Sequence, residues 1–339
     1  IGMNITTDSS FDDLLGVTKE EVMEMLKIYG LAAKQDDIFA RMDDWYNGYK
    51  FSRDVEHTIY NTDMVLYYIN SLIQKNEEPE ELIDINVRSD YSKIRFLVQT
   101  GKKLNGNFSV LQELLSTGRV RVSKIADSFS ALDIRDRNNF VSLLFYLGLI
   151  TIEKYELGLL TLRIPNQTIQ KILATFIQKA LEEQDVFPIR LDSFNLLVQE
   201  LAYFQKLTVF DYLAEQLEQR SKIRDYISGE SFIKGFLVAY LSLNTYYEVF
   251  TEMERGKGFV DIYLNPIHKD IPFIVAIELK YIKRNEFTQE LLKEKTVEAV
   301  AQLERYQLPE NTVPVVLVFN GWELVKVLDA REKEQVPSE

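Results

Sequence analysis

Apolar residues recur at helical spacing through the first part of the chain and in strand-like runs through much of the last part. The helical spacing predicts helices over residues 18–29, 36–46, 62–75 and 91–100. Thr18 and Glu21 form a capping-box pattern, which predicts that the first of these helices begins there. The first part of the chain is therefore expected to be helical.

The middle of the chain combines a helix with a hairpin. Residues 140–147 continue the helical pattern, and two short apolar runs follow around Glu156-Leu-Gly158 at residues 149–154 and 159–164. A helix followed by a hairpin is winged-helix-like, and such units bind DNA or pack domains together. We favour packing, because Glu153 and Glu156 stand where a DNA-binding unit needs basic residues.

The last part of the chain has the pattern of an α/β core. A helix is predicted over residues 165–183, the sequence Asp185-Val-Phe-Pro188 is the best candidate for a linker, and residues 192–219 read as two helices. The core that follows is predicted to contain a helix at 230–243, strands at 246–253, 258–264 and 273–281, a helix at 289–306, and strands at 313–319 and 322–328. Asn320-Gly321 between the last two strands indicates a tight turn.

These elements predict an α+β multidomain protein. A helical N-terminal region with a winged-helix-like unit precedes an α/β core with a mixed central sheet. The expected domains are residues 1–125, 126–187 and 188–339.

Three charged residues stand out in the apolar strands of the predicted core. Glu278 and Lys280 are two residues apart on one strand, so they emerge on the same face of the sheet. Asp261 lies among apolar residues in the preceding strand, and hairpin pairing can put its carboxylate beside Glu278. Two carboxylates and a lysine would then share one pocket.

This grouping suits metal-assisted hydrolysis of a phosphodiester. Asp261 and Glu278 supply the hard oxygen ligands that Mg²⁺ prefers at about 2.0–2.1 Å, and the carbonyl of Leu279 is a further candidate ligand. Lys280 would orient or help to deprotonate the attacking water and offset negative charge on the phosphate. The alternative is an ordinary salt bridge on a partly exposed strand. The continuous apolar run from Phe273 to Ile277 instead favours a strand covered on both faces, where unpaired charges are costly.

The residues that carry this pattern resemble the PD-(D/E)XK nuclease superfamily. The resemblance rests on Gly256-Lys-Gly-Phe-Val-Asp261, on Ile277-Glu278-Leu-Lys280 and on Ala299-Val-Ala-Gln302-Leu-Glu-Arg-Tyr306. Val260 stands where the name of the superfamily has proline. The resemblance implies a restriction-endonuclease-like core, a Mg²⁺ or Mn²⁺ cofactor and a nucleic-acid substrate.

The resemblance also implies further site residues on helices. Gln302 and Tyr306 would support the site from one face of a helix, and Glu230 would add a carboxylate from the helix before the first strand. Each has a plainer alternative: a solvated glutamine, a packing aromatic, and a glutamate that complements a helix dipole. Glu248 and Glu252 on the first strand are weaker candidates for the extra carboxylate.

The N-terminal region resembles one bacterial branch of this superfamily, in which an AAA-ATPase-like region precedes the nuclease-like domain. The matching segments are Trp45-Tyr-Asn-Gly-Tyr-Lys-Phe51, Ile59-Tyr-Asn-Thr-Asp-Met-Val-Leu66, Leu144-Phe-Tyr-Leu-Gly-Leu-Ile150 and Arg163-Ile-Pro-Asn166. The phosphate-binding pattern G-x-x-x-x-G-K-[ST] is missing and the chain opens in mid-pattern, so an ATPase-like module is expected upstream or in trans.

Composition narrows the function classes. The chain has 339 residues, no cysteine and two histidines, which argues against thiolate zinc sites, disulfides and Ser-His-Asp catalysis. No apolar run approaches the length of a membrane helix and no signal peptide opens the chain, so we expect a cytoplasmic protein without a membrane partner.

The formal net charge of −13 argues against simple non-specific binding to nucleic acid. Acidic and basic residues are nearly balanced between Glu252 and Tyr306, however, and a set of basic residues there could follow a phosphate backbone: Lys280, Lys283, Arg284, Lys293 and Lys295. The sequence thus predicts a metal-dependent nuclease. A catalytically inactive binding or regulatory protein with the same fold is the alternative.

Overall fold

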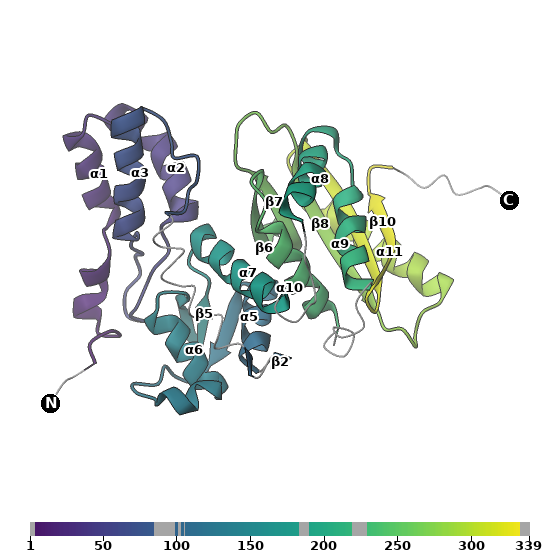
Figure 1. The fold of residues 1–339 in the computed structure, drawn as a ribbon, viewed down its shortest axis with the longest axis horizontal. Coiled ribbons are helices and arrows are strands. Elements are labelled where there is room, and N and C mark those ends of the chain that lie inside the picture. Colours follow the sequence, from purple (N-terminus) through teal and green to yellow (C-terminus); the bar gives the residue numbers. More distant parts are fainter. Residues whose placement is uncertain are drawn as a thin grey trace. The chain divides into compact units, whose positions relative to one another are not determined.

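The computed structural model describes residues 4–84, 99–100, 103–104, 106–182, 190–218 and 229–332 (Figure 1). The chain divides into two units. The first comprises Ile1–Leu114 and Arg119–Ile177, and the second comprises Leu115–Gly118 and Gln178–Glu339. The division at residues 125 and 187 that the sequence suggests stays a prediction.

The first unit begins with helices, as the sequence predicts. They are η1 (Ser9–Leu15), α1 (Lys19–Ile28), η2 (Ala32–Lys34), α2 (Gln35–Trp45) and α3 (Thr62–Lys75). The capping box is confirmed, since the Thr18 side chain accepts a hydrogen bond from the Glu21 N–H and the Glu21 carboxylate accepts one from the Thr18 N–H. Each partner satisfies a backbone donor that the helix itself leaves free.

The prediction of a helix over residues 91–100 is wrong at its C-terminal end. Gln99–Thr100 forms the strand β1, which pairs with β2 (Lys103–Leu104). Only Gly101 and Lys102 separate the two strands in the sequence, and a two-residue connection with glycine favours a hairpin over a helix. The remainder of the predicted helix, residues 91–98, lies outside the described residues.

A small sheet follows in the middle of the chain. The elements in order are α5 (Gly106–Thr117), β3 (Arg119–Val122), η4 (Ala131–Arg135), α6 (Arg137–Tyr146), β4 (Thr151–Glu156), β5 (Leu159–Arg163) and α7 (Gln167–Glu182). The predicted helix and hairpin are present, and β3 joins the hairpin to give the order β3-β5-β4. Glu153 on β4 forms a bidentate ion pair with Arg119 on β3. The winged-helix likeness itself stays a prediction.

Two of the segments that carry the N-terminal resemblance contact each other in this unit. The Asn166 side chain donates a hydrogen bond of 2.8 Å to the carbonyl of Asn47, and Thr168 donates one of 2.7 Å to the carbonyl of Trp45. Gly48 has a φ of 101°, and a Cβ there would lie 2.3 Å from the carbonyl oxygen of Pro165. A glycine is required because both the backbone angle and this close approach exclude a side chain.

The second unit contains the α/β core. Its elements are α8 (Leu191–Phe204), α9 (Thr208–Glu218), α10 (Glu230–Leu241), β6 (Tyr247–Arg255), β7 (Gly258–Pro266), β8 (Ile274–Ile282), α11 (Gln289–Arg305), β9 (Thr312–Asn320) and β10 (Glu323–Asp329). Their order and type match the sequence prediction. The predicted linker at residues 185–188 lies outside the described residues.

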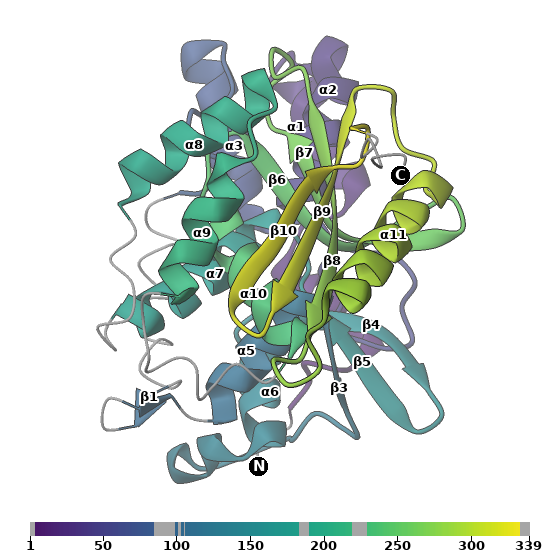
Figure 2. The ribbon, with the colours of Figure 1, turned by 90° about the vertical axis from the view of Figure 1, so that its right-hand side faces the viewer.

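The central sheet has five strands in the order β10-β9-β8-β7-β6. Adjacent strands are antiparallel except β8 and β9, which are parallel and are joined by the crossover helix α11. The mixed sheet predicted from the sequence is therefore confirmed. Figure 2 shows α11 on one side of the sheet and α8, α9 and α10 on the other. Helices on both sides explain why β8 and β9 read as almost continuous apolar runs.

The turn between β9 and β10 lies one residue later than predicted. Asn320 is still paired with Glu323, so the connecting residues are Gly321 and Trp322. Gly321 has a φ of 63°, and such a left-handed residue is what a two-residue hairpin connection needs.

Candidate active site

Strands β7 and β8 separate near the middle of the sheet. Their paired residues are Ile262–Leu264 on β7 and Val275–Ile277 on β8. Asp261 immediately precedes this paired segment of β7, and its Oδ2 atom accepts a hydrogen bond of 2.9 Å from the backbone N–H of Leu279. Where the strands part, the Asp261 carboxylate thus accepts the hydrogen bond that a backbone carbonyl of β7 would otherwise accept. This contact directs the carboxylate into the gap between the two strands.

Glu278 and Lys280 flank Leu279 on β8 and form an ion pair. The Lys280 Nζ atom lies 3.0 Å from Glu278 Oε1 and 3.6 Å from Glu298 Oε1. Only 3% of the Glu278 side chain and 11% of the Lys280 side chain are exposed. The pair is therefore a buried one, unlike the partly exposed salt bridge considered as an alternative, and a buried charge needs both its partner and further hydrogen bonds.

The environment of Glu278 favours its protonated form. Burial, together with the negative charge of Asp261, raises the pKa of Glu278 to about 7, against the opposing effects of Lys280 and Tyr306. Burial lowers the pKa of Lys280, but Glu278, Glu298 and Asp261 together outweigh that effect, and the net pKa is raised. The site therefore holds an ammonium that keeps its proton more firmly than an ordinary lysine, beside a carboxyl group that titrates near neutral pH.

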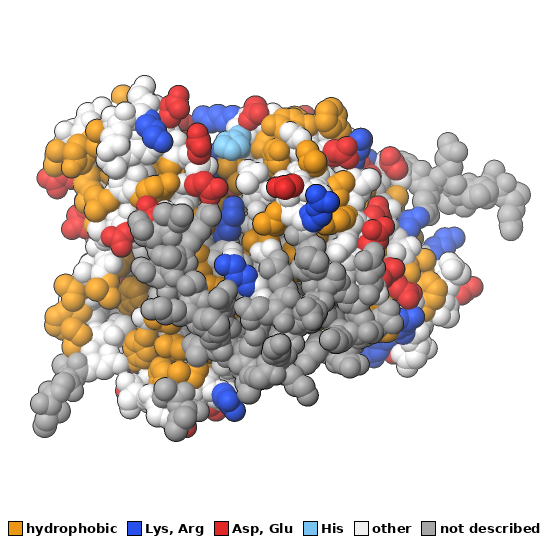
Figure 3. All heavy atoms as spheres, viewed as in Figure 1, with side chains coloured by type: hydrophobic (Ala, Val, Ile, Leu, Met, Phe, Trp, Pro, Cys, Tyr) orange, Lys and Arg blue, Asp and Glu red, His pale blue; other side chains and the backbone are white. Residues whose placement is uncertain are grey.

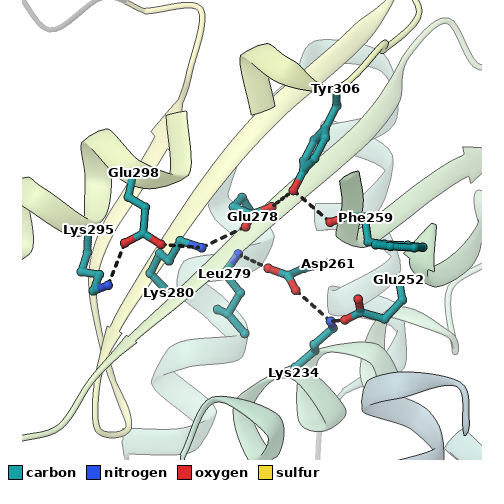
Figure 4. A network of polar contacts seen from close by, with 10 residues as sticks. All are labelled: Lys234, Glu252, Phe259, Asp261, Glu278, Leu279, Lys280, Lys295, Glu298 and Tyr306. Atoms are coloured by element: carbon teal, nitrogen blue, oxygen red, sulfur yellow. Dashed lines mark hydrogen bonds and ion pairs between the residues drawn. The ribbon is translucent and has the colours of Figure 1, made fainter. Parts of the chain in front are cut away.

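Tyr306 joins this pair from the C-terminal cap of α11. Its hydroxyl lies 3.1 Å from Glu278 Oε2 and 2.9 Å from the carbonyl oxygen of Phe259, and it can donate to either (Figure 4). Its ring lies over Gly258, where a Cβ would be 2.6 Å from the Tyr306 Cε1 atom. The absence of a side chain at Gly258 therefore allows Tyr306 to reach Glu278.

Gln302 lies on the same face of α11. Glu298, Gln302 and Tyr306 are spaced four residues apart, and the outer two contact Lys280 and Glu278 respectively. The Oε1 atom of Gln302 is buried and has no hydrogen-bond partner within the described part of the chain. It is an available acceptor on the helical face that covers the site.

A residue absent from the sequence prediction completes the network. Lys234 of α10 donates a hydrogen bond of 2.8 Å to Asp261 Oδ1 and a second hydrogen bond to Glu252. Figure 4 shows it reaching the cluster from a different helix than Tyr306. The signal in the sequence was a lone lysine inside an otherwise apolar helix, four residues after Glu230.

The three other candidate glutamates, Glu230, Glu248 and Glu252, differ in their contacts with the site. Glu252 belongs to the network, whereas Glu248 contacts Asn265 at a distance of 3.0 Å. Glu230 lies in the first turn of α10 and is exposed as a residue. Partial desolvation of its carboxyl group and the charge of Asp261 raise its pKa, so it senses the cluster electrostatically.

The comparison with known proteins agrees with this geometry. Residues 228–327 match the PD-(D/E)XK nuclease superfamily. The matched segment runs from just before α10 into β10, and so it includes every residue of the network described above. No curated protein matches the chain. In the part of the chain that the structure describes, no helix is long and apolar enough to cross a membrane.

The donor set of this nuclease-like domain fits a divalent metal. Asp261 and Glu278 offer carboxylate oxygens, and the unpaired oxygen of Gln302 lies on the neighbouring helical face. Magnesium suits such a site, because it binds through one or two carboxylates and keeps several waters. Among the described residues, no three acidic or histidine side chains form a ready-made metal cage. The remaining ligands would therefore be water and substrate.

Proposed function

We propose that this chain is a metal-dependent nuclease that hydrolyses phosphodiester bonds with Mg²⁺ or Mn²⁺. The observation that carries the proposal is the group formed by Asp261, Glu278 and Lys280. It lies where β7 and β8 separate, within the segment that matches the nuclease superfamily.

Each of these residues has a distinct role in the proposed reaction. Asp261 and Glu278 would hold the metal, which supplies Lewis-acid stabilisation of the phosphate and lowers the pKa of a bound water. Lys280 would orient the attacking water as a hydrogen-bond donor and offset negative charge on the phosphate. Tyr306 is a positioning residue, because its hydroxyl fixes one oxygen of Glu278.

Nucleic acid is the substrate that we propose, although the surface charges limit how it binds. Four of the five basic residues that could follow a phosphate backbone have acidic partners: Lys280 with Glu278, Lys283 with Glu286, Arg284 with Glu323, and Lys295 with Glu298. In Figure 3, acidic and basic side chains are interspersed over the described part of the visible face. We therefore expect recognition to depend on the site itself more than on a broad basic surface.

We further propose that the N-terminal part belongs with an AAA-ATPase-like module, supplied upstream or in trans. This rests on the resemblance of the segments around Trp45–Phe51 and Arg163–Asn166 to that bacterial branch. Hydrogen bonds join the two segments, which explains structurally why both occur in one chain. The cytoplasmic location that we expect from the sequence stays a prediction.

A catalytically inactive binding protein is the second candidate. It is favoured by one observation: all four carboxylate oxygens of Asp261 and Glu278 already have donors from the chain itself. These donors are Lys234, the Leu279 N–H, Lys280 and Tyr306. A protein that never binds metal would have the same arrangement.

Cleavage of labelled single- and double-stranded DNA and RNA with Mg²⁺ or Mn²⁺ tests the proposal. We expect cutting by the wild-type chain that chelator abolishes and that Asp261→Asn and Lys280→Met both lose. Well-folded wild-type protein that binds nucleic acid without cutting it, alone or with an ATPase-like partner, would establish the second candidate instead.

A further inference from the structure

Lys234 is a charged residue in the middle of a buried helix. Every residue of α10 from Phe232 to Leu241 is buried, and Lys234 is only 5% exposed. Lysine is almost never buried to this degree unless it is paired. Its burial therefore calls for a specific partner at the end of its side chain.

That partner is the carboxylate of Asp261. The Lys234 ammonium lies 2.8 Å from Asp261 Oδ1, while the other Asp261 oxygen accepts from the Leu279 N–H. Burial lowers the pKa of Lys234, but Asp261 and Glu252 outweigh this effect, and the net pKa is raised. The ammonium is thus the cation that neutralises Asp261 in the metal-free protein.

The backbone of β6 is distorted beside this ion pair. Glu252 has a φ of 51°, a left-handed conformation that is unusual for a residue other than glycine. Its strand neighbours pair as Thr251 with Ile262 and Met253 with Val260, which places Glu252 opposite Asp261. The distorted residue accepts a hydrogen bond from Lys234, so the ammonium has a second carboxylate within reach. Backbone strain of this kind is typical of functional sites.

A metal and the Lys234 ammonium cannot share Asp261 Oδ1 without strong repulsion. A magnesium ion binds a carboxylate oxygen at about 2.0–2.1 Å. With the ammonium 2.8 Å from the same oxygen, the two cations would be at most about 5 Å apart. Repulsion at that distance in a partly buried site is substantial.

We infer that Lys234 is an internal counter-ion that competes with the divalent metal for Asp261, so that metal binding requires its ammonium to leave Oδ1 and to remain with Glu252. This inference rests on the proposed function, because it concerns the same metal site. According to this inference, Lys234 sets the affinity of the site for metal and has two opposing effects. The ammonium weakens metal binding, and it stabilises the cluster when no metal is present.

Calorimetry of Mn²⁺ binding to the full chain tests the inference. Replacing Lys234 by a neutral residue, as Lys234→Gln or Lys234→Met, should tighten Mn²⁺ binding by about ten-fold or more, within the usual range of coupling between two sites. Lys234→Arg retains the charge and should not tighten it. Lys293→Gln on the exposed side of α11 removes the same charge away from the cluster and is the matched control. Circular dichroism establishes that each variant is folded.

A second measurement uses the wild-type chain and so does not depend on a variant that folds. Acetylation of lysines, followed by mass spectrometry, should label Lys234 slowly without metal and at least several-fold faster with saturating Mn²⁺. Lys293 should be labelled equally in both conditions. Competition predicts this difference because the metal removes one of the two carboxylate partners of Lys234.

The outcomes separate this inference from the proposed function. Unchanged or weaker Mn²⁺ binding in folded neutral variants overturns the inference, as does Mn²⁺-independent labelling of Lys234 or an absence of Mn²⁺ binding by all variants. Tighter binding together with faster labelling supports it whether or not the protein cuts nucleic acid. A lack of cleavage at saturating Mn²⁺ argues only against the nuclease proposal.

Discussion

The carboxylate of Asp261 accepts a hydrogen bond from the backbone N–H of Leu279, at a distance of 2.9 Å. This contact links β7 to β8 at the point where their regular pairing ends. It also fixes the position of the two residues on either side of Leu279, which are Glu278 and Lys280. Asp261 therefore has a structural role as well as its proposed role in metal binding.

Replacement of Asp261 should separate these two roles. Asp261→Asn keeps an oxygen that can accept from Leu279 but loses the charge, so we expect a folded protein whose cleavage falls by more than about 100-fold, since loss of even an outer-shell partner costs 10–100-fold. Both variants lose the ion pair with Lys234, and Asp261→Ala also leaves the Leu279 N–H without its acceptor. An unsatisfied buried donor costs about 1–3 kcal/mol, so Asp261→Ala should be less stable than Asp261→Asn in urea unfolding. Equal stability of the two variants would contradict the structural role.

The core was largely predictable from the sequence, and particular residues show why. The single β8 segment carries both an apolar run and the pair Glu278 and Lys280, so the pattern gave its type, its burial and the shared face of the two charges. The apolar residues on both sides of Asp261 in β7 likewise pointed to this aspartate. Strand periodicity of two residues makes such inferences direct.

Contacts between elements distant in the sequence were harder to predict. Lys234 and Asp261 are 27 residues apart, and no local pattern shows that the lysine of α10 meets β7. The left-handed backbone at Glu252 is also invisible in the sequence, because nothing in the local pattern calls for a positive φ at a glutamate within a strand. The turn at Gly321 was displaced by one residue because Asn320 remained in the ladder. In each case tertiary packing decided the outcome.

The raised pKa of Glu278 predicts a pH-dependent stability in the metal-free protein. The ordinary pKa of this group is 4.5, and that in the folded protein is about 7. Between these values the folded state binds more protons than the unfolded state, so the free energy of unfolding falls as the pH rises. The loss should amount to at most about 3 kcal/mol. Urea unfolding from pH 4.5 to pH 8 should detect it.

The control for this prediction is Glu278→Gln, which cannot titrate. It should flatten the fall in stability, and an equally steep pH dependence in Glu278→Gln and the wild-type protein would show that Glu278 does not titrate in this interval. Mn²⁺ should bind more tightly to the wild-type chain as the pH rises through about 7. The carboxylate must lose its proton before it can bind a metal.

Lys280 should matter more for cleavage than for metal binding. Lys280→Met removes the ammonium that lies 3.0 Å from Glu278 Oε1. We expect single-turnover cleavage at saturating Mn²⁺ to fall by about 100-fold or more, as for other groups that stabilise developing charge. Calorimetry should still detect Mn²⁺ binding that depends on Asp261. Normal cleavage by Lys280→Met would remove the lysine from the proposed mechanism, and Lys280→Arg tests whether charge alone is sufficient.

Tyr306 and Gly258 should act as one unit on Glu278. The hydroxyl of Tyr306 lowers the pKa of Glu278, so Tyr306→Phe should raise the pH midpoint of Mn²⁺ binding and of cleavage. Loss of such a supporting contact costs about 10–100-fold in affinity or activity. Gly258→Ala keeps the hydroxyl, but its Cβ would lie 2.6 Å from the Tyr306 ring and would push the ring away from Glu278. The two variants should therefore show similar upward shifts, and the double variant should add little to either. A folded Gly258→Ala protein with the wild-type midpoint would show that the ring can move while its hydroxyl stays in place.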